Sequence, residues 1–184
     1  LGCLAHIFDS VLPTGLAVDE RVGGLSDGVD LIVCSHLHYD HCGGNAHLGD
    51  VPVLVQRDEW DAAHGGDPLA GYLDADFETG QDVKLLDGEH DVFGDGSVVC
   101  IPTPGHTAGH QSLRVRTDER ELLLTGDACY FGETFDTGLM PVFANDLERQ
   151  SQSLELLRTM AAGGSHLIFG HDADQFPDDE VVAL

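Results

Sequence analysis

Three histidines and one aspartate lie within residues 36–41, in the segment His36-Leu-His-Tyr-Asp-His41. His36 and His38 are two residues apart, so in an extended chain their side chains point the same way and both can reach one ion. Asp40 and His41 follow where the chain turns, and they can face a neighbouring position. Neutral imidazole and carboxylate groups hold Zn²⁺, Mn²⁺, Fe or Co at neutral pH. The segment therefore predicts a metal site.

Three further segments repeat one design, in which a hydrophobic strand ends in small residues and then in a side chain that can bind metal. They supply His106 in a glycine-rich turn, Asp127 after Thr125-Gly126, and His171 after Phe169-Gly170. Taken alone, each such residue is more often a surface or structural residue than a ligand. Four segments in one chain reverse this expectation, because strand ends meet along one edge of a sheet.

The elements that would position these residues follow from hydrophobic periodicity and turn residues. Strands are expected at 31–35, 51–56, 83–86, 97–101, 112–116, 121–125 and 166–169, and a helix at 57–64. A second helix should run from a cap at Asn145 or Asp146 to about Ala162, with an apolar stripe of Leu147, Leu154, Leu157 and Met160. Residues 36–44 are expected to form a loop, and residues 65–80 a mobile segment over the site. Strands in runs favour an α+β layered domain spanning 1–184, with residues 1–30 incomplete or irregular.

Charge is the most extreme bulk property of the 184 residues. There are 33 acidic and 8 basic residues, which gives a formal net charge of −25. Nucleic-acid binding is excluded on this basis because phosphate contacts need Lys and Arg, and attraction to an anionic membrane is disfavoured. No apolar run approaches the ~18–20 residues of a membrane helix. Hydrophobic residues make up 42% of the chain, enough for a packed core.

The cysteine content favours a reducing compartment, and hence a cytoplasmic location. There are five cysteines and no C-x-x-C pair, a pattern unlike a disulfide framework. We expect most of them to be small buried core residues, including Cys42 and Cys129 beside the candidate ligands.

The pattern His36-x-His-x-Asp-His41, followed by His106, Asp127 and His171, resembles the ligand set of the metallo-β-lactamase superfamily over residues 30–175. Segments 35–45, 53–60, 103–113, 127–130 and 169–172 resemble more narrowly the N-acyl-homoserine lactonases, which open the lactone ring of bacterial quorum-sensing signals. The resemblance implies an αββα four-layer sandwich with a dinuclear site at one edge.

The resemblance also implies the role of each ligand. His36, His38 and His106 would hold the first of two divalent metal ions, and Asp40, His41 and His171 the second. Asp127 would bridge the two ions together with a hydroxide. An anionic bridge suits two cations ~3.5–4 Å apart because it offsets their repulsion. Zn²⁺ is the favoured metal, with Mn, Fe or Co as alternatives.

The implied reaction is hydrolysis of a lactone to a hydroxy acid by hydroxide attack on the ring carbonyl. Tyr130 would donate a hydrogen bond to the developing oxyanion, or it is a core aromatic residue. Asp40 would protonate the leaving alkoxide, or it is a ligand only. His110 would hold His106 or its turn, and Asp172 would orient a ligand or cap a strand end. An acyl-chain pocket or the core would contain Phe131, Phe135, Leu139, Met140 and Phe143.

Alternatives to the lactonase remain open at this point. The same metal pair could serve an arylesterase, a phosphotriesterase or a β-lactam hydrolase, and a non-enzymatic metal-binding protein is an alternative of another class. Only 35 residues precede His36, fewer than the family pattern, so we expect a fragment or a truncated amino-terminal sheet with an exposed edge. Asp9 is the candidate remnant of an aspartate-containing turn in that region. The expected partner is a small lactone or ester, and a homo-oligomer is left open.

The acidic composition generates a prediction about salt. Lys84 is the only lysine, and an Asp-rich, Lys-poor surface is typical of a halophile's protein, in which salt screens self-repulsion. Raising KCl from about 0.1 M to about 1 M shortens the screening length from about 10 Å to about 3 Å. We therefore expect the Tm to rise by about 5 °C or more, measured by thermal unfolding, with NaCl at equal ionic strength as the control. An unchanged Tm would favour an ordinary acidic cytosolic protein.

Overall fold

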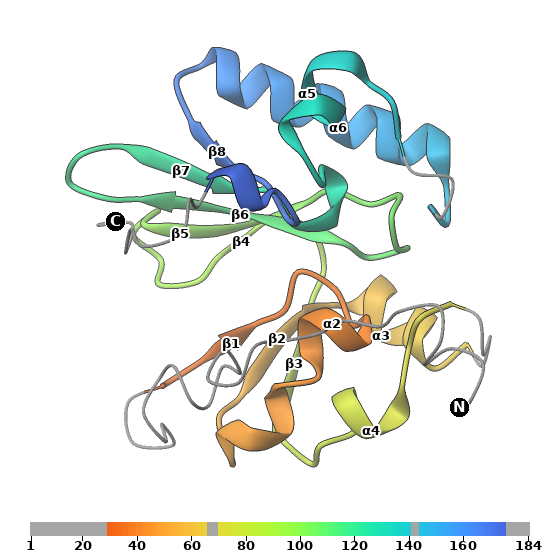
Figure 1. Ribbon diagram of the computed structural model, residues 1–184. Helices are drawn as coiled ribbons and strands as arrows, with labels where there is room; N and C mark the ends of the chain where they lie inside the picture. Colours follow the sequence, from red (N-terminus) through yellow and green to blue (C-terminus); the bar gives the residue numbers. More distant parts are fainter. Residues whose placement is uncertain (1–28, 66–69, 141–143, 176–184) are drawn as a thin grey trace.

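The computed structural model describes residues 29–65, 70–140 and 144–175 (Figure 1). Asp9 and Phe143, which were singled out from the sequence, lie outside these ranges, as does Cys3, one of the five cysteines. The single-domain boundaries at 1–184 stay a prediction for the same reason.

Two β-sheets form the centre of the molecule. The smaller sheet is parallel, with the order β1 (Ile32–Val33), β2 (Val53–Gln56) and β3 (Val83–Leu86). The larger sheet has the order β4 (His90–Asp91), β5 (Val98–Pro102), β6 (Gln111–Arg116), β7 (Glu121–Leu124) and β8 (His166–Ile168). Its strands pair antiparallel except β7 and β8, which are parallel.

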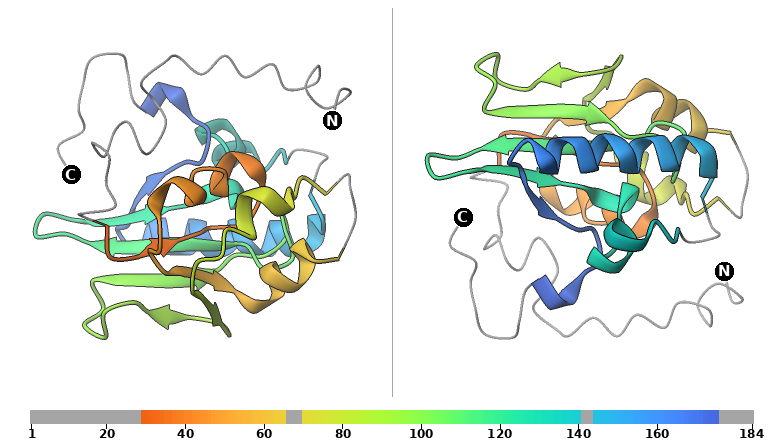
Figure 2. Two further views of the ribbon diagram at one scale, coloured as in Figure 1. Left: turned by 90° about the horizontal axis from the view of Figure 1, so that it is seen from below. Right: turned by 90° about the horizontal axis from the view of Figure 1, so that it is seen from above.

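Helices cover the outer face of each sheet. The helices beside the smaller sheet are α2 (Tyr39–Cys42), α3 (Arg57–Ala63) and α4 (Asp74–Phe77), with the 3₁₀ turn η1 (Asn45–Leu48). The larger sheet carries α5 (Gly132–Thr137) and α6 (Leu147–Ala162), with the 3₁₀ turns η2 (Gly126–Ala128) and η3 (Ala173–Gln175). In Figure 2 the helices beside the smaller sheet lie nearest the viewer when the molecule is seen from below, and α6 lies nearest when it is seen from above, so the two helical layers lie on opposite sides of the sheets. The order is helix, sheet, sheet, helix, which confirms the expected α+β sandwich.

The seven strands expected from the sequence are all present, and their ends differ from the predicted ones by at most two residues. The two expected helices are found at 57–63 and 147–162, and Asp146 caps the second by accepting a hydrogen bond from the Arg149 N–H at 3.0 Å. The loop expected at 36–44 is wrong in part, because it contains α2. This helix of four residues has no side-chain cap and is too short to show a period.

The apolar stripe expected on α6 is also wrong in part. Leu154 and Leu157 are buried against β7 and η2, but Leu147 is 51% exposed. Near its beginning, α6 contacts the neighbouring loops through polar side chains. Gln150 donates to the Asp127 carbonyl at 3.1 Å and Ser153 donates to the Pro104 carbonyl at 2.7 Å. The buried face of the helix is therefore polar at one end and apolar at the other.

A pair of buried glutamines joins the two sheets. Gln56 at the end of β2 donates to the Gln111 side-chain oxygen at 2.8 Å, and Gln111 at the start of β6 donates to the Cys34 carbonyl at 2.7 Å. Gln56 also exchanges two hydrogen bonds with the backbone of Gly88. Buried amides need such partners, so the two side chains determine how the sheets lie against each other at this end.

The cysteines behave as the sequence predicted. Cys34, Cys42, Cys100 and Cys129, the four within the described ranges, are buried free thiols. Across these ranges, no helix has the length and apolarity needed to cross a membrane.

A partly exposed histidine links α3 to the chain after α4. His64 Nδ1 lies 2.7 Å from the Trp60 carbonyl oxygen, and its Nε2 lies 2.5 Å from Glu78 Oε1. Hydrogen bonds to the Trp60 carbonyl and to Glu78 favour the protonated ring, so the pKa of His64 is raised.

A pH-dependent contribution to stability follows from this raised pKa. The stabilisation should be fully present below the unfolded pKa of about 6.5 and be lost as the pH rises through the folded pKa. We expect His64→Gln to lower the free energy of unfolding at about pH 6 by less than about 1 kcal/mol, since the pair is exposed, and by less still at about pH 9. Urea unfolding at both pH values measures this, with the exposed His90→Gln as the control. An equal effect of His64→Gln at both pH values would contradict it.

Candidate metal centre

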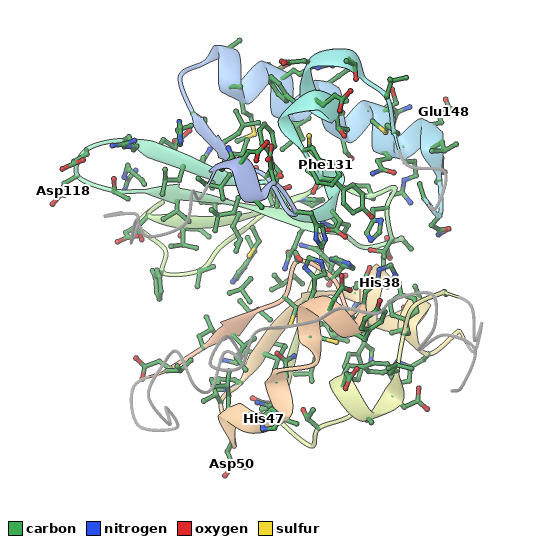
Figure 3. The ribbon with its side chains drawn as sticks, viewed as in Figure 1. His38, His47, Asp50, Asp118, Phe131 and Glu148 are labelled. Atoms are coloured by element: carbon green, nitrogen blue, oxygen red, sulfur yellow. The ribbon has the colours of Figure 1, made fainter. Side chains whose placement is uncertain are left out.

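The seven candidate ligands come from both halves of the sandwich. His36 and His38 follow β1, and α2 carries Asp40 and His41. The other three follow strands of the larger sheet: His106 after β5, Asp127 in η2 after β7, and His171 after β8. Figure 3 shows His38 where the two halves meet, beside a group of side-chain nitrogen atoms. His41 and His171, whose side chains are in contact, are 130 positions apart in the sequence.

The first cluster consists of His36, His38 and His106. His106 Nε2 lies 3.2 Å from His36 Nε2 and 3.0 Å from His38 Nδ1, and the three ligand atoms lie within 4.8 Å of one another. Burial lowers the pKa of His106 to about 4 and also lowers those of His36 and His38. The rings are therefore neutral at pH 7, and neutral imidazole nitrogen is the form that binds metal.

The second cluster consists of Asp40, His41 and His171. The two Nε2 atoms of His41 and His171 lie 3.3 Å apart. Asp40 Oδ2 lies 3.7 Å from His41 Nε2 and 4.0 Å from His171 Nε2. This cluster is more open to solvent than the first, because the Asp40 side chain is 42% exposed.

Asp127 lies between the two clusters with one oxygen toward each. Its Oδ2 is 3.3 Å from His106 Nε2, whereas its Oδ1 is 3.2 Å from His41 Nε2 and 3.1 Å from His171 Nε2. Burial acts to raise the pKa of Asp127, but the imidazoles of His171 and His41 outweigh it, and the pKa lies well below its usual value. The side chain is an ionised carboxylate in contact with both clusters.

The donor set fits a pair of divalent cations. Asp127 Oδ1 is buried and makes no well-oriented hydrogen bond within the described part of the chain. A buried charged oxygen without such a partner is costly unless a cation satisfies it. The imidazole nitrogens within each cluster face one another at 3.0–3.3 Å, a spacing that a shared ion or an N–H···N hydrogen bond satisfies. Each cluster offers three nitrogen or oxygen donors, and the Asp127 carboxylate offers one oxygen to each.

Two buried side chains hold the backbone of Asp127 from opposite sides. His110 Nε2 accepts a hydrogen bond from the Asp127 N–H at 3.0 Å, and Gln150 donates to the Asp127 carbonyl at 3.1 Å. Burial lowers the pKa of His110 to about 3, so its ring is neutral and Nδ1 carries the proton toward Thr103, 2.9 Å from Oγ1 and 3.1 Å from the carbonyl oxygen. His110 was expected to hold His106 or its turn. It closes that turn at Thr103 and also holds Asp127.

The glycines of the His106 turn are required by close packing. A Cβ atom at Gly105 would lie 2.1 Å from the backbone nitrogen of Gln150, and a Cβ at Gly109 would lie 2.1 Å from that of Glu59. Gly105 also has φ of +136°, which favours glycine. The turn is therefore held closely between α3 and α6.

Tyr130 lies at the edge of the first cluster. Its hydroxyl is 2.9 Å from His106 Nδ1, and its ring stacks on the His171 ring with centroids 5.2 Å apart. Asp172 makes no hydrogen bond to either cluster within the described ranges. Its Oδ2 accepts from the Gly132 N–H at 2.8 Å and so ties the last turn to the start of α5.

Four of the five apolar residues considered for an acyl-chain pocket lie in the described ranges, and they separate into two groups. Phe135 and Met140 pack on the core beside α6. Phe131 and Leu139 are 45% and 72% exposed, so they are free to contact a ligand or another surface.

Glu59 on α3 is a fully buried carboxylate that was not among the residues predicted to belong to the site. Burial raises the pKa of Glu59, while hydrogen-bond donors around it act in the opposite direction. A signal was present, since Glu59 lies four residues before the buried Ala63 and therefore on the inner face of the helix.

The comparisons with known proteins agree with this geometry. The family model of the metallo-beta-lactamase superfamily matches residues 5–173. An N-acyl homoserine lactonase of a Bacillus species is 35% identical over 158 residues, covering 85% of this chain and 61% of its own length. N-acyl homoserine lactonase AttM of Rhizobium radiobacter is 37% identical over 155 residues, covering 79% of this chain and 59% of its own.

A solved structure of an N-acyl homoserine lactone hydrolase, with the product N-hexanoyl-L-homoserine bound at its catalytic metal centre, superposes with a TM-score of 0.77. It is 33% identical, and the match covers 89% of this chain and 64% of that one. The chain spans about three fifths of the length of the curated relatives it matches. With the ligand pattern, the layered fold and the match over residues 5–173 in agreement, the chain belongs to the metallo-beta-lactamase superfamily.

Proposed function

We propose that this chain forms the metal-binding catalytic part of a hydrolase that opens the lactone ring of N-acyl homoserine lactones. The observation that carries the proposal is the Asp127 carboxylate, which directs Oδ2 to the first imidazole cluster and Oδ1 to the second. The named activity of relatives at 35% and 37% identity supports the choice of substrate.

Two divalent cations would be shared among the seven ligands. His36, His38 and His106 would hold the first cation, and Asp40, His41 and His171 the second, with Asp127 between them. Zn²⁺ suits a set of imidazoles and carboxylates, and Mn, Fe or Co suit it as well. Such a pair, when bound, lowers the pKa of water toward neutrality and polarises a carbonyl group.

Tyr130 is the proposed donor to the oxyanion that develops on the lactone carbonyl. When His106 uses Nε2 as a ligand, its proton lies on Nδ1 and is donated to the Tyr130 hydroxyl oxygen 2.9 Å away. The phenolic proton of Tyr130 is then free to donate toward the substrate. Burial and the Asp127 charge raise the pKa of Tyr130, so the phenol keeps that proton at neutral pH.

Asp40 is proposed to accept the proton of the hydroxyl group that has added to the carbonyl carbon and to pass it to the leaving alkoxide. Its side chain is 42% exposed and lies at the open side of the second cluster, where substrate and water can reach it. A role as ligand only is the alternative for Asp40. The two roles differ because protonation by Asp40 would weaken the dependence of the rate on the basicity of the leaving alcohol, which is steeper when the alkoxide leaves unprotonated.

The substrate assignment is tested on a panel. The metal-loaded protein is assayed with N-hexanoyl homoserine lactone, paraoxon and nitrocefin, and we expect ring opening of the lactone to be the fastest reaction. A faster rate on paraoxon or nitrocefin would replace the lactonase with a phosphotriesterase or a β-lactam hydrolase. No turnover of any substrate with two cations bound would favour a non-enzymatic metal-binding protein.

Replacement of the carboxylate between the clusters should cost both metal and activity. We expect Asp127→Ala to hold fewer than two cations after dialysis and to lose about 10²-fold or more in kcat/KM, since the repulsion between the cations is then not offset. Elemental analysis and the lactone assay measure the two effects. Asp118→Ala, an exposed change of the same charge on the turn after β6 (Figure 3), is the control. Two tightly held cations in Asp127→Ala would contradict the bridging role.

Loss of the phenol should affect turnover but not metal content. We expect Tyr130→Phe to keep two cations and to lower kcat by about 10²-fold, the usual effect of removing one oxyanion donor. Steady-state kinetics on the lactone and elemental analysis of the same sample separate the two quantities. An unchanged kcat would remove Tyr130 from the mechanism.

A further inference from the structure

Glu59 is a buried carboxylate that the proposed mechanism does not use. Its side chain is 0% exposed, and no salt bridge to Glu59 is found in the described ranges. Burying a carboxylate is costly unless hydrogen bonds compensate for the lost water. The identity of those hydrogen bonds therefore shows what this residue holds in place.

Three segments donate hydrogen bonds to Glu59. Its Oε1 accepts from the Leu37 N–H at 2.9 Å and from the Tyr72 hydroxyl at 3.1 Å. Its Oε2 accepts from the Gly109 N–H at 3.1 Å. Both carboxylate oxygens are in use, and the two backbone donors belong to different halves of the sandwich.

Each of the three segments adjoins the first cluster. Leu37 lies between His36 and His38, and Gly109 lies three residues after His106 in the same turn. The Tyr72 ring packs on the His38 ring with centroids 5.1 Å apart. One carboxylate therefore joins the parts of the chain that carry all three members of this cluster.

In the described part of the chain, the second cluster has no hydrogen bond to Glu59, and only Asp40 and His41 are joined indirectly to the segment that Glu59 holds, through α2. His171 follows β8, and Asp40 and His41 lie on α2, where backbone hydrogen bonds return to His38 and Tyr39. Asp127 is held by His110 and Gln150. A change at Glu59 should therefore act on the first cluster more than on the second.

We propose that Glu59 is a positioning residue that fixes the His36–His38 loop against the His106 turn, and thereby determines how tightly the first cation is held relative to the second. This inference rests on the proposed pair of cations. It concerns the spacing of three ligands that Glu59 does not touch, and it assigns no step of the reaction to Glu59.

The variant Glu59→Gln tests the proposal, because it keeps the shape of the side chain and replaces one of the two acceptor oxygens with an NH₂ donor. The NH₂ group of the glutamine would lie either on the side of the Gly109 N–H or on the side shared by the Leu37 N–H and the Tyr72 hydroxyl. A donor that faces another donor makes no hydrogen bond, so the connection on that side is lost. Asp58→Asn is the matched control: it removes the same charge from the neighbouring exposed position of α3. Cation affinities are measured by competition with a chromophoric chelator, using Zn²⁺, and circular dichroism checks the fold.

We expect Glu59→Gln to weaken one of the two cation affinities by about 10–100-fold, the usual effect of changing an outer partner of a ligand, and to leave the other unchanged. The weakened site is assigned by comparison with His38→Ala and His171→Ala, each of which removes a ligand of one cluster. In Glu59→Gln loaded with Co²⁺, only the absorption bands of the Co²⁺ ion at the weakened site should shift. Asp58→Asn should match the unmodified protein in both affinities.

Two results would overturn the proposal. One is wild-type affinity at the first site, and the other is an equal loss at both sites, which would indicate a general structural role. If Glu59→Gln does not fold, Tyr72→Phe is used instead, since it removes a single hydrogen-bond donor to Glu59. It should weaken the cation affinity of the first site by about threefold. An unchanged affinity in Tyr72→Phe would overturn the proposal. Fewer than two bound cations in the unmodified protein would instead contradict the proposed metal pair. The affinities of the unmodified protein and of Glu59→Gln are then compared for the cation of the first site.

Discussion

The contact of one buried carboxylate with two groups of imidazoles is the interaction on which the rest of this structure depends. Asp127 is ionised, is held by its backbone on both sides, and divides its two oxygens between the clusters. A carboxylate in such surroundings is stable only when positive charge balances it. The other elements of the molecule position the ligands that would hold this positive charge on both sides of Asp127.

Each half of the sandwich contributes a different part of this arrangement. The smaller sheet supplies the loop after β1 and the short helix α2, which present four of the ligands. The larger sheet supplies three strand ends with one ligand each. Polar side chains with no role as ligands (Gln56, Gln111, His110 and Gln150) hold these parts in register. Hydrogen bonds to the backbone and to each other compensate for the burial of most of their polar atoms, although Gln150 Oε1 has no partner in the described part of the chain.

The sequence predicted the candidate ligands and the strands because both depend on short-range patterns. His36 and His38 are spaced for one face of an extended chain, and His106, Asp127 and His171 each follow a strand. Glu59 could not be predicted in the same way, because carboxylates are rarely buried and its partners lie 13 to 50 residues away. The prediction that Leu147 belongs to the buried stripe of α6 was wrong for a related reason. Gln150 and Ser153 occupy the buried face there because they make hydrogen bonds to distant loops, and hydrophobic periodicity does not reveal such contacts.

The glutamine pair between the sheets has a consequence for the thermodynamics of ion uptake. Gln56 and Gln111 set the separation of the two halves without using any of the seven ligands. Much of the entropy of bringing those halves together is therefore lost during folding and not when an ion arrives. An ion that enters such a preorganised cage uses little of its binding energy to order the chain, and its affinity depends on the donor atoms and on how the surrounding residues position them.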